Sequence, residues 1–110
     1  MDYPEIINKL PAINIPLNGA VARLLQGPAS QLVFFDFKED TEIPMHSHGA
    51  QWGIVVDGKI DLTIGAETRT YRKGDSYSIP SGTLHGGKIY AGLKVIDYFE
   101  DADRYRAEKA

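Results

Sequence analysis

Short hydrophobic segments separated by turn residues follow one another along most of this 110-residue chain. In 60–64, for example, Ile60, Leu62 and Ile64 alternate with a polar Asp and Thr. Alternation with period two is typical of a strand that has one buried and one solvated face. The turn signals recur roughly every 8–12 residues, which favours an all-β sandwich or barrel. They are Asn18-Gly19, Gly27-Pro28, Asp57-Gly58, Ile64-Gly65, Lys73-Gly74-Asp75, Pro80-Ser81-Gly82 and Gly86-Gly87.

The clearest hairpin signal lies between residues 53 and 64. Asp57-Gly58 separates two apolar-rich segments, and this dipeptide favours a type I′ turn between paired strands. We therefore predict a β-hairpin over 53–64, within an antiparallel barrel or double-sheet jelly roll of six to eight strands.

The last predicted strand contains a local conflict. Its residues Leu93, Val95, Asp97 and Phe99 share one face, opposite Lys94, Ile96 and Tyr98. A carboxylate in line with apolar side chains breaks the binary pattern, and such breaks often mark functional sites.

The two ends of the chain differ from this strand pattern. Asp2 and Glu5 around Pro4 resemble a helix start, and Pro11 would close that segment. Residues 101–110 are expected to form a terminal helix or a frayed tail. We expect one domain, with a core over about 18–100, an N-terminal arm over 1–17 and a C-terminal tail over 101–110.

Composition narrows the classes of function. The net charge of −3 gives no basic surface for nucleic acid or an anionic membrane. No segment is apolar for long enough to span a bilayer, and the first residues lack the features of a secretory signal. The absence of cysteine fits a reducing compartment, so the expected location is the cytoplasm.

The three histidines of the chain fall in two places that a β-fold can bring together. His46 and His48 lie two residues apart, a spacing that points both side chains to one face of a strand. His85 follows the Pro80-Ser81-Gly82 turn, which would return a later strand toward them. With the amide oxygen of Gln51, three neutral imidazoles form a plausible ligand set for a divalent transition metal. The metal is expected to be Ni, Zn, Mn, Fe or Co.

These two segments resemble the paired motifs of the cupin superfamily. His46-Ser47-His48 with Gln51 and Gly58 resembles the first motif, and Gly74, Pro80, Gly82 and His85 resemble the second. The resemblance implies a small, single-domain protein with the cupin double-stranded β-helix, a jelly-roll barrel. Cupins commonly carry Glu where this chain has Gln51. An amide leaves the metal site at a formal charge of +2, which favours binding of a carboxylate or enolate.

A closer resemblance is to the small cupins of pectin and alginate degradation, which open 4,5-unsaturated uronates. It rests on the string from His46 to Gly53 and on the ending Val95-Ile96-Asp97-Tyr98-Phe99 followed by Arg104. It implies Asp97 as an acid or base, Phe99 as a pocket wall and Arg104 as a partner for the substrate carboxylate. Arg104 lies one residue beyond the position the pattern gives, which Asp103 occupies.

Three functions stay open on the sequence alone. The first is a metal-dependent isomerisation or ring opening of an acidic sugar, with Asp97 transferring a proton. The second is a dioxygenase acting on an enol or aromatic substrate, and the third is a barrel that binds a sugar or metabolite without turnover. Each implies a small-molecule partner, expected to be anionic. Arg23, in an early strand, is a second candidate for its carboxylate.

Other residues near the motifs have simpler explanations. Tyr77, Ile79 and Leu84 are expected in the core, and Trp52 is expected to face outward or to meet a second subunit. The N-terminal arm is rich in isoleucine and leucine, more so than a solvated arm needs. We therefore expect a homodimer that buries this arm.

Overall fold

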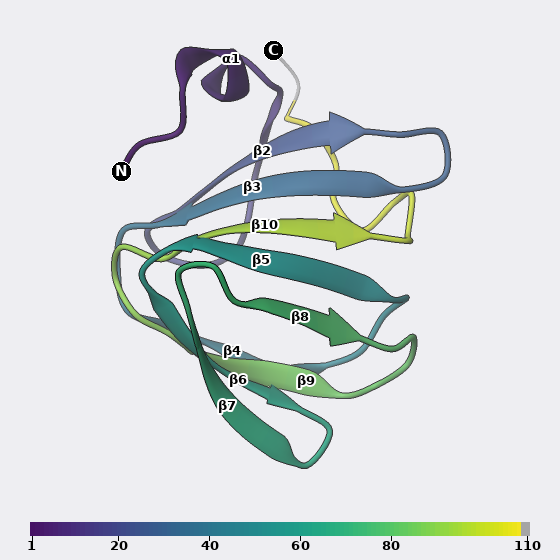
Figure 1. Ribbon diagram of the computed structural model, residues 1–110. Helices are drawn as coiled ribbons and strands as arrows, with labels where there is room; N and C mark the ends of the chain where they lie inside the picture. Colours follow the sequence, from purple (N-terminus) through teal and green to yellow (C-terminus); the bar gives the residue numbers. More distant parts are fainter. Residues whose placement is uncertain (109–110) are drawn as a thin grey trace.

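The alternating segments of this chain form two antiparallel β-sheets, as the computed structural model shows for residues 1–108 (Figure 1). One sheet has six strands in the order β1-β2-β3-β10-β5-β8, and the other has four in the order β4-β9-β6-β7. The all-β prediction is confirmed, with more strands than the six to eight expected. The elements are α1 (Glu5–Asn8), β1 (Ala12–Ile13), β2 (Ala20–Gln26), β3 (Gln31–Phe37), β4 (Thr41–His46), β5 (Gln51–Asp57), β6 (Lys59–Ile64), β7 (Glu67–Arg72), β8 (Ser76–Ile79), β9 (His85–Ile89) and β10 (Lys94–Phe99).

The core lies between the two sheets. Alternate residues of β3 and β10 point into it from the six-stranded sheet, and Ile60 and Leu62 point into it from β6. The shared face predicted for the last strand is confirmed, because Leu93, Val95, Asp97 and Phe99 are all buried. Asp97 is therefore placed inside the barrel by the same pleat that buries its apolar neighbours.

The predicted hairpin over 53–64 is wrong. β5 pairs with β10 and β8 in one sheet, whereas β6 pairs with β9 and β7 in the other. A type I′ turn needs positive φ at both central residues, and here only Gly58 has it, at 75°. Asp57-Gly58 instead carries the chain across from one sheet to the other. A side chain at Gly58 would lie 2.8 Å from the Cα of Leu93, so this close crossing requires glycine.

The first residues of the chain and the segment 101–108 both pack against the barrel. The predicted N-terminal helix is a single short turn, Glu5–Asn8, and the Tyr3 hydroxyl before it donates to the carbonyl oxygens of Phe35 and Val95. Over 101–108 the chain forms turns rather than a helix, and Ala107 forms a β-bridge with Ile13. Residues 109–110 of the predicted tail lie outside the described part of the chain.

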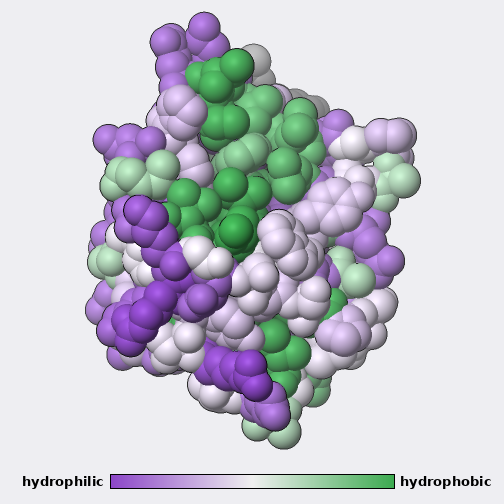
Figure 2. All heavy atoms as spheres, viewed as in Figure 1, coloured by the Kyte–Doolittle hydropathy of each residue, from purple (hydrophilic) through white to green (hydrophobic). Residues whose placement is uncertain are grey.

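The outer face of the six-stranded sheet carries exposed apolar side chains. The exposed large side chains on this face include Val21, Leu25, Trp52 and Tyr98, each 43–50% exposed. Figure 2 shows hydrophobic residues gathered in the upper half of the view. Trp52 faces outward, as predicted. No helix within residues 1–108 has the length and apolar character needed to cross a membrane.

Candidate metal centre and its pocket

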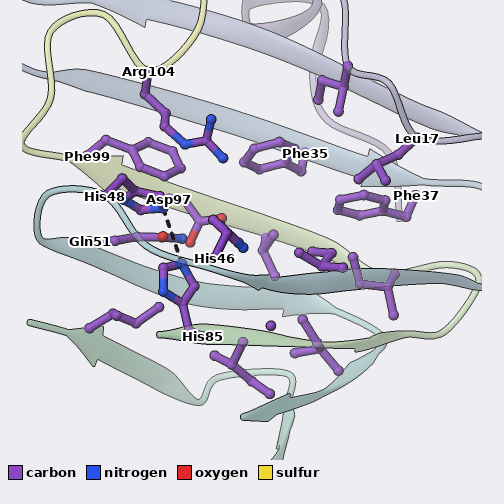
Figure 3. Close-up of a pocket in the computed structure, with 18 of the residues that line it drawn as sticks. Leu17, Phe35, Phe37, His46, His48, Gln51, His85, Asp97, Phe99 and Arg104 are labelled. Carbon is purple, nitrogen blue, oxygen red and sulfur yellow. Dashed lines mark hydrogen bonds between the residues drawn. The ribbon is translucent and has the colours of Figure 1, made fainter. Parts of the chain in front are cut away.

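The three histidines converge at one end of the barrel (Figure 3). His46 is the last residue of β4 and pairs across the ladder with His85, the first residue of β9. His48 lies in the loop after β4, so the strand ends between the two histidines instead of containing both as expected. The candidate ligand nitrogens of the three rings all lie within 4.8 Å of one another.

Hydrogen bonds set the tautomer of each ring. The Nδ1 atoms of His46, His48 and His85 lie 2.8–2.9 Å from the carbonyl oxygens of Pro44, Gly49 and Thr83. A carbonyl oxygen only accepts, so each Nδ1 carries the proton and each neutral ring keeps the lone pair on Nε2. Backbone carbonyls commonly orient metal-binding histidines in this way.

The geometry of the lone pairs fits a divalent cation. The Nε2 atoms of His48 and His85 face each other at 3.2 Å, although with protonated Nδ1 atoms neither neutral ring has a proton to donate there. Burial lowers the pKa of both rings, and nearby Arg104 acts in the same direction, which disfavours a shared proton. Metal–nitrogen bonds of about 2.1 Å suit two nitrogens at this separation. The three imidazoles therefore form a group able to hold a divalent metal.

The loop that carries His48 is fixed by the end of β10. The Gly49 N–H donates to Asp101 Oδ2 at 2.9 Å, and the Ala50 N–H donates to the Glu100 carboxylate. The same Asp101 oxygen lies 3.8 Å from His48 Nδ1. Sequence reasoning missed Asp101, because its partners are about 50 residues away in the chain and no local pattern connects them.

Asp97 shares a cross-strand row with a glycine and a tyrosine. Gly53 of β5 pairs with Asp97 of β10 on one side and with Tyr77 of β8 on the other. The Tyr77 hydroxyl donates to Asp97 Oδ1 at 2.6 Å across this row. A Cβ atom at Gly53 would lie 2.1 Å from Asp97 Oδ1 and 2.4 Å from the Tyr77 ring. The missing side chain of Gly53 is therefore what lets the two polar groups meet.

The Asp97 carboxyl lies in an environment that penalises its charged form. Its side chain is 4% exposed, and this burial raises its pKa from 3.8 to about 6, while hydrogen bonds from Tyr77 and Gln51 act against the rise. The amide of Gln51 donates to Asp97, which leaves the amide oxygen as its remaining polar group. Tyr77 was expected to be simple core; it is buried, and its hydroxyl also donates to the Asp97 carboxylate in the cavity.

Phe99 and Arg104 lie beside the histidines. The Phe99 ring is 5.5 Å from the His48 ring, and the Arg104 guanidinium stacks 4.7 Å from the Tyr105 ring. Arg104 Nε is buried without a hydrogen-bond partner. Asp103, which occupies the position the family pattern gives to arginine, is exposed. Arg23 faces the outer side of the sheet, where it donates to Leu10, and does not line the cavity.

These residues open into one cavity of about 350 Å³. His46, His48, Gln51, His85, Asp97 and Arg104 gather at one end of it, and Leu17, Phe35 and Phe37 lie toward the other (Figure 3). Ile79 is buried as expected. The core prediction for Leu84 is wrong, because the turn before β9 turns it outward and leaves it 56% exposed.

Comparison with known proteins identifies this architecture. The family model of the cupin domain matches residues 33–92, more than half of the chain. An RmlC-like cupin from Shewanella frigidimarina has a similar structure, with a TM-score of 0.79 and 23% identity over 94% of this chain and 92% of that one. KdgF from Halomonas sp. has a TM-score of 0.71 and 25% identity over 79% and 83%.

A larger protein contains the same fold. Oxalate decarboxylase from Bacillus subtilis, described with Mn(II) centres, has a TM-score of 0.72 and 20% identity over 88% of this chain and 29% of its own length. No curated protein matches the sequence.

Proposed function

This chain belongs to the cupin family, and we propose that it is a metal-dependent enzyme that transfers a proton on a small carboxylate substrate. The observation that carries the proposal is the placement of three groups at one end of one cavity. Three Nε2 lone pairs converge there, the buried Asp97 carboxyl lies beside them, and Arg104 has an unpartnered buried nitrogen.

His46, His48 and His85 would hold the metal, and the free amide oxygen of Gln51 would be the fourth ligand. A bound divalent metal would polarise a substrate oxygen and stabilise the anion formed when a proton leaves. Because all four ligands are neutral, the site would keep the full charge of the metal and attract an anionic substrate.

Asp97 would take the proton from the substrate and return it at a second atom. Its carboxyl is held by Tyr77 and Gln51, so one orientation is kept through both steps. Arg104 would bind the substrate carboxylate through its guanidinium, and Phe99 would exclude water from that side. The similarity to KdgF, a pectin-degradation cupin, makes unsaturated uronates the first substrates to assay for isomerisation.

The test uses protein purified without chelator and assayed with and without oxygen. His48→Ala should lose bound metal and turnover together, whereas Asp97→Asn should keep the metal, measured by elemental analysis, and lose turnover. Near-normal turnover by Asp97→Asn would show that Asp97 is not the group that transfers the proton. Oxygen consumption coupled to turnover would establish a dioxygenase instead, and ligand binding with no turnover of any substrate would establish a binding protein.

A further inference from the structure

The cavity changes character with depth along the strands. Asp97 lies level with the metal end, Val95 follows on the same face of β10, and Leu93 lies just before the strand and also lines the cavity. Phe35 pairs with Val95, and the Phe37 N–H donates to the Leu93 carbonyl. These four apolar residues therefore form the next two cross-strand rows beyond Asp97. Two residues of a strand span roughly 6.6 Å, so this apolar part extends on the order of 13 Å beyond Asp97.

The four-stranded sheet also changes from polar to apolar side chains along the cavity. His85 of β9 pairs with Ile64, but the next levels down the ladder are Gly87 with Leu62 and Ile89 with Ile60. Ile60, Leu62 and Ile89 all line the cavity. The segment between β1 and β2 adds Leu17 to the same part of the wall, and Ile15 of this segment also lines the cavity.

Among the described residues, the polar side chains that line the cavity gather at its metal end, apart from Tyr105, whose ring packs edge-on against both Phe99 and Phe35. Those at the metal end are the three histidines, Gln51, Asp97 with its partner Tyr77, and Arg104 stacked on Tyr105. A substrate hydroxyl placed deeper would be buried without a hydrogen-bond partner, which costs binding free energy. An apolar group in the same place would contact side chains on all sides.

We infer from this division, building on the proposed function, that the substrate is a carboxylate with an apolar body. The carboxylate lies at Arg104 and the metal end, and an aliphatic or aromatic group fills the space between Phe35, Phe37 and Leu17. A uronate carries hydroxyl groups on several carbons of its ring, and these groups match only the metal end of this cavity.

Calorimetric titration of the zinc-loaded protein with three probes tests the inference. The probes are acetate, phenylacetate and galacturonate, which share one negative charge. Phenylacetate should bind at least about tenfold more tightly than either of the others, because only its ring buries apolar area. Leu17→Asn should weaken phenylacetate binding severalfold and leave acetate binding unchanged. The matched control is Leu25→Asn, a half-exposed leucine on the outer face, which should change neither.

Each other outcome decides against the apolar body, and one of them also decides against the proposed function. Galacturonate binding as tightly as phenylacetate, or equal effects of the two leucine variants, would overturn the apolar body. If Arg104→Gln weakens acetate binding and phenylacetate still binds no more tightly than acetate, the apolar body fails while carboxylate recognition stands. If none of the three probes binds, both the inference and the carboxylate substrate of the proposed function are overturned.

Discussion

Gly53 is the residue on which the hydrogen bond between Tyr77 and Asp97 in the pocket depends. It lies between Asp97 and Tyr77 in the sheet, and any side chain there would occupy the space where their oxygens meet. In the sequence it is one glycine after a tryptophan, with no turn or positive φ to mark it. Its importance follows from two cross-strand neighbours, one 24 residues and the other 44 residues further along the chain.

Removing the Tyr77 hydroxyl should reduce turnover without removing the metal. Tyr77→Phe keeps the ring but loses the donor that holds Asp97, so we expect kcat to fall on the order of 10- to 100-fold. The lost hydrogen bond stabilised the charged carboxylate, so the pKa of Asp97 should rise and the acidic limb of the pH–rate profile should move to higher pH. Gly53→Ala should have the same effects by steric displacement.

Tyr90→Phe is the matched control, because Tyr90 also donates to an aspartate at 2.6 Å, on the outside of the other sheet. It should change neither kcat nor the pH profile. Equal effects of the two tyrosine variants would show that Tyr77 contributes to stability only.

Asp97→Asn should stabilise the metal-free protein at high pH. Folding raises the pKa of Asp97 from 3.8 to about 6, so the folded state binds this proton more tightly than the unfolded state. The wild type therefore loses stability as the pH rises from about 4 through 6, and the loss amounts to about 2–3 kcal/mol at 1.36 kcal/mol per pKa unit. Asparagine has no charge to bury and avoids this loss.

Urea unfolding in chelator between pH 4 and pH 8 measures the difference. The variant should be more stable at pH 8 by up to about 2–3 kcal/mol, and the difference should shrink toward pH 4. A difference that does not depend on pH would mean that Asp97 titrates near its ordinary pKa.

At the scale of elements, the β4–β5 loop is positioned by the end of β10 rather than by its own sequence. Asp101 accepts from the Gly49 N–H, and the His48 carbonyl accepts from the Gly82 N–H. The loop that holds His48 is thus bound to two later segments. His46 and His48 were expected on one strand; instead His48 lies in this loop, and the two rings still converge.

Asp101→Ala should weaken metal binding while leaving all three histidines in place. Loss of a group that orients a metal-binding loop typically costs 10- to 100-fold in affinity, and we expect an effect of about that size in chelator competition. Asp103→Ala, two residues away and exposed, should have no effect. Equal affinities of the two variants would show that the loop holds its shape without Asp101.

At the scale of the whole molecule, the homodimer stays a prediction, but the surface expected to form its interface changes from the N-terminal arm to the outer face of the six-stranded sheet. The N-terminal arm packs largely on its own chain, with Ile13 buried and paired to β2, although Ile6 stays 75% exposed. The outer face of the six-stranded sheet also leaves apolar side chains exposed, among them the cross-strand pair Trp52 and Tyr98.

Light scattering of the metal-loaded protein at micromolar concentration should give the mass of a dimer. Tyr98→Lys should shift the mass to that of a monomer, because a charge would be buried at the interface. The control Met45→Lys changes a similarly exposed residue on the other sheet and should leave the dimer intact. A monomer mass for the wild type would contradict the prediction.

The sequence by itself determined the all-β class, the cupin family and the three histidines. Period-two alternation and turn residues are local signals, and the two histidine motifs are short enough to be read directly. The inward face of the last strand, with Asp97 in it, followed from the same alternation.

Only the tertiary structure decided which strands pair and which residues support the site. Asp57-Gly58 is a good local hairpin signal, but β5 and β6 separate into two sheets because each pairs with strands that are distant in the sequence. Gly53, Tyr77 and Asp101 act through cross-strand and loop contacts, which leave no pattern along the chain. The division of the cavity into a polar end and an apolar depth arises because strand register stacks residues from both sheets in common levels.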